Sequence, residues 1–336
     1  MRRNHEQLRI LAGRQAFTLV ELLVVCTVIA MLVALTFFAV HKASVSAKIA
    51  KTRATIQKIE AAFQPIFEAY EELFTVFKNR YPALSDEERV IIAVHFVRDL
   101  MRMEMPQNWA EVCNTNGEPL GPLEITLNGD TYSVGESPLL HYYWQTYHHS
   151  EKPPSRSALL FLIIQNLNPE ALEAFHGSEV ADTDGDGLLE FIDAWGRPIH
   201  FLRWAPAFPD SELQPNILTL RNPKYVPQKN IENNRNWWWN RDGQLSVAMD
   251  KAGRELPYLL GDEDNAFGWF LYPLIYSAGP DGEYGIDEGD DSWIQKLIRK
   301  WEQDGRIDPY AFPFGMPSGT GHHFDNIHNH QWYRSF

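Results

Sequence analysis

The sequence has few cysteines, no surplus of basic residues and no common catalytic motif. Two cysteines in 336 residues, Cys26 and Cys113, cannot build a disulfide scaffold. Only 30 lysine and arginine residues stand against 44 aspartate and glutamate residues. The net charge of −14 argues against nucleic acid as a partner, because phosphates are bound by basic patches. No glycine-rich phosphate loop, nucleophile elbow or zinc-protease helix motif occurs, so we expect no enzyme activity.

The sequence does contain enough apolar residues for a folded protein of about two domains, at roughly 150 residues each. Hydrophobic residues make up 44% of the chain and charged residues 22%, which excludes a disordered or collagen-like protein. The charges are unevenly distributed. Residues 1–16 contain four arginines and one acidic residue, Glu6, whereas the 19 residues from Leu22 to Val40 carry no charge.

The uncharged stretch from Leu22 to Val40 has the length of a membrane span, since about 20 apolar residues in a helix cross the hydrocarbon core of a bilayer. The basic residues before it predict that the N-terminus stays in the cytoplasm and that the rest of the chain is exported. A cleaved secretory signal is the alternative. Such a signal has small residues after its apolar core, whereas Gly13 and Ala16 precede the apolar stretch here.

Residues 15–23, Gln-Ala-Phe-Thr-Leu-Val-Glu-Leu-Leu, resemble the class III signal of type IV pilins and type II secretion pseudopilins. In that family a membrane aspartic peptidase, the prepilin peptidase, cleaves before the phenylalanine and methylates the new N-terminus. The resemblance implies cleavage between Ala16 and Phe17, with alanine where the family usually has glycine. It also implies that Glu21, which is costly in lipid without a partner, pairs with the N-terminal amine of a neighbouring subunit. The alternative is a plain signal anchor that carries this motif by chance.

A single long helix is expected after the signal. The sequence has neither glycine nor proline between residues 41 and 63, and apolar side chains recur there at helical spacing. The leader would occupy residues 1–16, the transmembrane half of a pilin spine helix residues 17–40, and its amphipathic half residues 41–79. Pro65 is expected to kink or end the helix, because proline removes a backbone hydrogen bond.

The rest of the chain predicts a large head, which gives the protein an α+β fold. Residues 80–177 predict a helical insert, residues 178–292 a small antiparallel sheet with acidic loops, and residues 293–336 a C-terminal tail.

Within the insert, Ser85 and Glu88 have the spacing of a capping box that opens a helix. Asn128-Gly129 predicts a turn between two short strands. Residues 157–167 predict another helix, and residues 169–177 a further one capped by the preceding asparagine.

Residues 182–193 have the carboxylate spacing of a calcium-binding loop, with acidic residues at positions 1, 3, 5, 9 and 12 and glycine at position 6. The predicted oxygen donors, including the carbonyl at position 7, are Asp182, Asp184, Asp186, Leu188, Glu190 and Asp193. Position 12 is aspartate where an EF-hand has glutamate, and the Trp-Gly-Arg-Pro that follows leaves no room for an exit helix. The pattern therefore predicts a structural calcium site rather than a sensor. A solvated acidic turn is the alternative.

A second acidic segment is similar to the C-terminal half of the major pseudopilins. Residues 193–198 read D-x-W-G-x-P, and residues 276–282 read Y-S-x-G-x-D-G with further acidic residues downstream. In the family this arrangement holds one calcium ion. The resemblance implies that its donors here are Ser277, Asp287, Asp290 and Asp291. Asp281 would instead shape the turn. The resemblance covers residues 14–63 and parts of 190–292, less than half of the chain.

Two clusters of ring side chains stand outside these motifs. Trp237–Trp239 lie in an asparagine-rich stretch and either pack into their own domain or bind a sugar or protein by stacking. Four histidines near the C-terminus are expected to be solvated, with a transition-metal site as the alternative: His322, His323, His328 and His330. Cys113 is expected to be buried or free.

Together these features predict a pseudopilin-type structural subunit of a type II secretion or type IV pilus machine. It would be a single-pass inner-membrane protein with a cytoplasmic leader and a head in the periplasm or on the pilus. Its expected partners are the prepilin peptidase and other pilin or pseudopilin subunits, and its expected cofactor is calcium. The large head favours a minor or specialised subunit, whereas Glu21 argues against a role at the tip alone. The alternative is a membrane-anchored, calcium-dependent adhesin or glycan-binding module.

Overall fold

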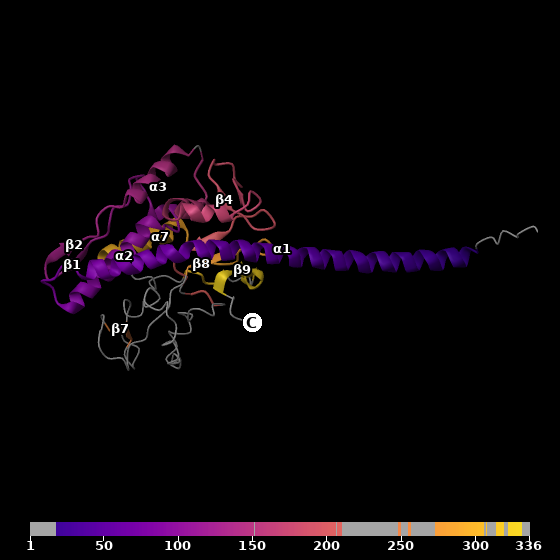
Figure 1. The fold of residues 1–336 in the computed structure, drawn as a ribbon, viewed down its shortest axis with the longest axis horizontal. Coiled ribbons are helices and arrows are strands. Elements are labelled where there is room, and N and C mark those ends of the chain that lie inside the picture. Colours follow the sequence, from indigo (N-terminus) through magenta and orange to yellow (C-terminus); the bar gives the residue numbers. More distant parts are fainter. Residues whose placement is uncertain are drawn as a thin grey trace, which may run out of the picture. The chain divides into compact units, whose positions relative to one another are not determined.

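The chain has the expected α+β fold, with one long helix followed by a head of helices and small antiparallel sheets (Figure 1). The computed structural model divides into two compact units between Ala47 and Lys48. The structure describes residues 18–150, 152–205, 207–209, 248–249, 255–256, 273–305, 307, 314–318 and 322–330.

Helix α1 spans Leu19–Lys78 and contains Pro65 in its interior. The sequence left open whether this proline would kink or end the helix, and the helix does not end there. Pro65 is exposed, whereas Phe63 and Ile66 on the neighbouring positions are buried in the core of the head. Proline removes one backbone hydrogen bond of the helix, and the packing of these side chains keeps the chain helical at that position.

Within the second unit, α1 supplies one side of the hydrophobic core. The ring of Phe63 stacks on Phe201 with 5.1 Å between the centroids, and Phe77 meets Phe96 edge to face at 5.5 Å. Such aromatic pairs contribute about 0.5–1.5 kcal/mol each beyond the burial of their area. The amphipathic half of α1 is thus a part of the head's core.

Helix α2 (Asp86–Glu104) begins with the predicted capping box. The side chain of Ser85 accepts a hydrogen bond from the backbone N–H of Glu88, and the Glu88 carboxylate accepts one from the backbone of Ser85. A short 3₁₀ helix, η1 (Trp109–Glu111), follows. Strands β1 (Ile125–Leu127) and β2 (Asp130–Tyr132) then pair antiparallel.

The turn between β1 and β2 confirms the prediction from Asn128-Gly129. Both residues have positive φ, 56° and 92°, as a two-residue hairpin turn requires. Helix α3 (Pro138–His149), which packs against α2, was not predicted as a separate element. Its signals were present, since Ser137 caps it and Pro138 occupies its first turn.

Helix α4 (Arg156–Leu167) begins one residue earlier than predicted and is capped by Ser155. It packs on β4 (Glu190–Phe191) and β5 (His200–Leu202). The expected helix after it is instead a 3₁₀ turn, η2 (Pro169–Ala174), which stops before Gly177. Asn168 makes no side-chain capping bond there, and its side-chain amide donates to the backbone carbonyl of Ala62 in α1, at 2.9 Å.

The described strands that follow are all antiparallel. β3 (Val180–Ala181) pairs with β4, and β6 (Ala248–Met249) pairs with β7 (Glu255–Leu256). The three-stranded sheet has the order β5-β8-β9, with β8 (Leu274–Ser277) between β5 and β9 (Ile327–His328).

Much of the predicted tail belongs to the folded head. Helix α7 (Asp291–Asp304) buries an apolar stripe that includes Ile294 and Trp301, packs against η1, and ends at Gly305 in the left-handed conformation. The 3₁₀ turn η4 (His322–Asp325) leads into β9.

Candidate functional site

The N-terminal end of α1 carries the first candidate site. Ala16 and Phe17, the expected cleavage and methylation positions, lie outside the described residues. The Glu21 carboxylate accepts hydrogen bonds from the backbone N–H and the hydroxyl of Thr18, both at 2.8 Å, and the Thr18 hydroxyl accepts one from the backbone N–H of Glu21. This reciprocal cap satisfies backbone donors that the first turn of a helix leaves unpaired.

Glu21 is followed by an apolar surface. The large apolar side chains from Leu19 to Val40 are 45% to 79% exposed. Among the residues that the structure describes, α1 is the one helix with an apolar stretch long enough to cross a membrane, and none of that stretch is buried within the chain. A surface of this kind needs lipid or other apolar helices as its surroundings.

The first acidic loop brings three of its six predicted donors together. Asp182, Asp184 and Asp186 each place a carboxylate oxygen within 4.8 Å of the others. The turn passes through Gly185 and Gly187, which have φ of 73° and 88°. Their backbone N–H groups donate to the Asp182 carboxylate at 2.7 and 3.1 Å. The backbone thus curls around these three carboxylates.

The other predicted donors of this loop have different surroundings. Leu188 donates its backbone N–H to the Asp186 carboxylate at 2.7 Å. Glu190 accepts hydrogen bonds from the Ser155 hydroxyl at 2.7 Å and from the backbone N–H of Thr183 at 2.8 Å. Burial raises the pKa of Glu190 in spite of these two bonds.

The Asp193 carboxylate, at position 12 of the loop, also accepts hydrogen bonds from groups outside the cluster. One of its carboxylate oxygens accepts the backbone N–H groups of Trp195 and Arg197 at 2.7 and 3.0 Å. The other accepts a hydrogen bond from the Ser277 hydroxyl. Glu190 and Asp193 therefore stabilise the fold around the loop, and the structure does not bring them to the three clustered carboxylates.

The four predicted donors of the second site do not converge. Ser277 is held by Asp193, and the Asp287 carboxylate accepts the backbone N–H of Gly289 at 2.9 Å. Asp290 caps α7, and Asp291 is the first residue of that helix. Hydrogen bonds from the side chain of Ser292 and the backbone of Trp293 lower the pKa of Asp290. In the described part of the chain, the only group of three or more acidic, histidine or cysteine side chains close enough to share a metal ion is Asp182, Asp184 and Asp186.

Asp281 was expected to shape the turn after β8, and it does so. Its carboxylate accepts the backbone N–H of Glu283 at 2.9 Å. The same carboxylate also pairs with the His322 ring at 2.7 Å.

Glu288 is a central residue that the sequence did not single out. Its carboxylate contacts Arg156 Nη1 at 2.7 Å and His200 Nδ1 at 2.5 Å, and it accepts a hydrogen bond from the Tyr276 hydroxyl. Burial alone would raise the pKa of Glu288, but the charges of His200 and Arg156 hold it well below its usual range. Nothing in the local sequence marks this glutamate among its acidic neighbours.

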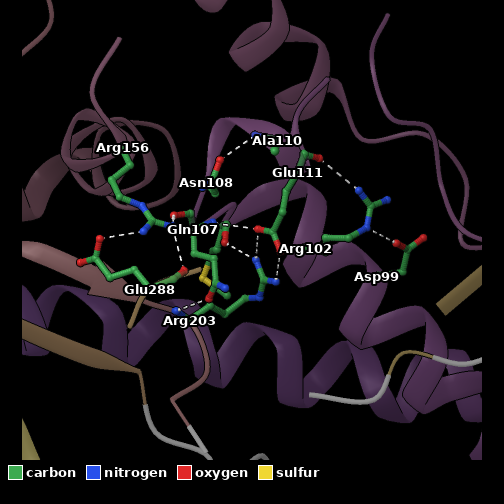
Figure 2. A network of polar contacts seen from close by, with 10 residues as sticks. Asp99, Arg102, Gln107, Asn108, Ala110, Glu111, Arg156, Arg203 and Glu288 are labelled. Atoms are coloured by element: carbon green, nitrogen blue, oxygen red, sulfur yellow. Dashed lines mark hydrogen bonds and ion pairs between the residues drawn. The ribbon is translucent and has the colours of Figure 1, made fainter. Parts of the chain in front are cut away.

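Arg156 extends this cluster into the core of the head. Its guanidinium donates to the backbone carbonyl of Gln107 at 3.2 Å, and the Gln107 side chain accepts the backbone N–H of Arg203 (Figure 2). Arg203 in turn makes a bidentate ion pair with Glu111 at 2.7 and 2.9 Å, with both side chains fully buried. These contacts hold helices and strands together.

The C-terminal histidines correct one expectation. His323, His328 and His330 are buried, and only His322 is exposed. β9 pairs with β8 and so draws the last two of them into the core.

Burial also raises the pKa of the Cys113 thiol. Trp237–Trp239, on which the adhesin alternative rests, lie outside the described residues.

The comparisons with known proteins concern the N-terminus. A family model described as the prokaryotic N-terminal methylation motif matches residues 11–37. No curated protein and no solved structure matches the chain. The matched segment contains Glu21 and most of the apolar surface, and it points to a structural subunit. The N-terminus therefore carries the class III prepilin signal of the type IV pilin and pseudopilin family, as its resemblance predicted.

Proposed function

We propose that the protein is a pseudopilin-type structural subunit of a type II secretion or type IV pilus machine. The observation that carries this proposal is the exposed apolar half of α1 directly behind the prepilin signal. The subunit would be inserted in the inner membrane by this single helix, with the leader in the cytoplasm and the head in the periplasm. The prepilin peptidase would then cleave before Phe17.

Assembly would exchange lipid for other apolar helices around α1. This exchange leaves the apolar side chains in similar surroundings, so it needs a polar interaction to fix the register of the subunits. Glu21 is suited to that role, because it is the single acidic residue between the leader and the end of the span. The work of the subunit is mechanical, and its large head suits a minor or specialised position in the fibre.

The test replaces Glu21 with alanine and follows both processing and assembly. Glu21→Ala should be cleaved normally, yet should no longer co-purify with other pilin subunits after crosslinking in cells. Glu72→Ala, which removes an exposed carboxylate from the same helix, is the matched control and should assemble. Normal assembly of Glu21→Ala would refute the docking role of this carboxylate.

We further propose that the loop at residues 182–186 holds a calcium ion. Three carboxylates within 4.8 Å of one another repel when no cation is present, and oxygen donors on a glycine-rich turn suit calcium. Glu190 and Asp193 are engaged elsewhere, so the backbone carbonyl of Leu188 and water would complete the shell. The ion would pin the loop between β3 and β4 and stabilise the head. A second calcium ion near Ser277 and Asp287 stays a prediction of the family resemblance.

A further inference from the structure

The C-terminal segment, defined as residues 322–330, is fastened along β8 and the turn after it. β9 pairs with β8 in the three-stranded sheet. The side chain of Asn329 accepts the backbone N–H of Ile275 and donates to the backbone carbonyl of Pro273, both at 3.0 Å. Asn326 donates to the backbone carbonyl of Tyr284 at 2.6 Å. The segment thus covers the edge of β8 opposite to β5.

Two imidazole rings lie at the buried end of this segment. His328 is 4% exposed and His330 is not exposed at all, and their ring centroids are 6.3 Å apart. The ring of Phe208 meets both edge to face, at 4.8 and 5.6 Å. The two rings are therefore part of the packing that holds the segment down.

The hydrogen bonds of these rings fit the neutral form. His328 Nδ1 accepts the backbone N–H of His330 at 3.2 Å, so this nitrogen carries no proton of its own. His330 Nε2 lies 3.2 Å from the carbonyl oxygen of Pro273, to which it donates. A proton added at His328 Nδ1 would point at another donor, and a charged ring would lack water.

Some charged groups of the described elements favour detachment of the segment in acid, and others oppose it. Arg53 of α1 opposes a positive charge on His328, as does His330 itself. Glu60 of α1 bonds to Asn329, and burial raises the pKa of Glu60 to about 7. At the other end of the segment, Asp281 raises the pKa of His322 through their hydrogen bond, so that exposed pair strengthens on acidification.

We propose that the C-terminal segment is an acid-sensitive latch, in which protonation of His328 and His330 detaches residues 322–330 from β8. Detachment exposes the backbone edge of β8 and hydrates both rings. The device does not depend on the proposed assembly into a fibre.

The direction of the pH dependence follows from burial. Burial lowers the pKa of His328 to about 3 and that of His330 to about 4, whereas a hydrated histidine titrates near pH 6.5. The attachment is therefore complete above about pH 6.5 and weakens as the pH falls from there. Glu60 has the opposite effect on attachment, because acidification removes the cost of burying its charge. It offsets the contribution of about one of the two histidines to the pH dependence.

Hydrogen exchange of the full chain in detergent micelles tests the latch, with rates corrected for the intrinsic effect of pH. Between about pH 6.5 and about pH 5, protection of residues 322–330 should fall roughly tenfold, because detachment takes up about one net proton and the His322–Asp281 pair opposes part of the effect. Protection of α4 serves as the internal reference. Loss of protection that is equal in α4 and the segment, or constant protection of the segment, would overturn the proposal.

Variants assign the effect to the two rings. His328→Asn keeps an acceptor near Nδ1 and His330→Gln keeps a donor near Nε2, so the double variant should stay attached at both pH values. His141→Gln, on the exposed side of α3, should behave like the wild type. A double variant that still releases the segment in acid would contradict the assignment.

A further variant covers the case in which the double variant never attaches. Glu60→Gln retains both histidines and removes the opposing carboxyl, so its loss of protection in acid should be steeper than in the wild type. An equal or shallower loss would count against the latch.

Discussion

The Ser277 hydroxyl donates a hydrogen bond of 2.7 Å to the Asp193 carboxylate, across 84 positions of the chain. Both residues are buried, at 0% and 2% exposure. Asp193 begins the D-x-W-G-x-P segment and Ser277 belongs to the Y-S-x-G-x-D-G segment. The two motifs are therefore joined directly by their own side chains.

This bond gives a stability prediction. Ser277→Ala leaves a buried carboxylate oxygen without its donor, and the free energy of unfolding should fall by about 1–3 kcal/mol. Ser292→Ala is the matched control, because it removes an exposed serine hydroxyl that donates to Asp290 at 2.7 Å. Denaturant unfolding in micelles compares the two variants. Equal and small effects would show that the buried bond contributes little.

The ion pair between Arg203 and Glu111 gives a larger expected effect. Glu111→Gln removes the charge that balances a fully buried guanidinium, and unfolding should become easier by about 3–5 kcal/mol. The control is Asp304→Asn, which breaks the exposed pair with Lys300 and should cost less than about 1 kcal/mol. Thermal unfolding of both variants measures the difference. A stable Glu111→Gln variant would mean that this ion pair, drawn in Figure 2, is dispensable for the fold.

Calcium should raise the melting temperature of the protein through the loop at residues 182–186. A ligand that binds only the folded state adds about 2.7 kcal/mol at a hundredfold excess over its Kd. The measurement is a thermal melt with EGTA or calcium at matched ionic strength. Magnesium should substitute poorly, because it requires a small and regular octahedron.

The loop variants locate this effect. Asp184→Asn should remove most of the calcium-dependent shift, whereas Glu118→Gln, at an exposed carboxylate elsewhere in the head, should retain it. Identical melts of the wild type with and without calcium would leave the loop as a solvated acidic turn.

The features that the sequence predicted correctly depend on residues close together in the chain. Ser85 and Glu88 form their capping box within a single turn, and Asn128 and Gly129 adopt positive φ within a single hairpin. The prepilin signal is likewise read from one continuous stretch, residues 15–23, which lies within the matched segment 11–37. In each case local chemistry determines the structure, so local sequence is sufficient.

The features that it missed depend on distant partners. Glu190 bonds to Ser155, which lies 35 positions earlier, and to Thr183 of its own loop, and it does not join the three clustered aspartates. His328 is buried because β9 pairs with β8, whose partner could not be chosen from sequence spacing. The sequence left open whether Pro65 kinks or ends α1, and the packing of its neighbours sustains the helix beyond it. Tertiary contacts decide all three.

The intact mass of the protein purified from membranes shows whether the chain is processed as a prepilin. Cleavage before Phe17 removes residues 1–16, and methylation adds one methyl group to the new N-terminal amine. We expect a mature protein that begins with N-methylated Phe17. A protein that retains Met1, or one that has been cut beyond Val40, would contradict it.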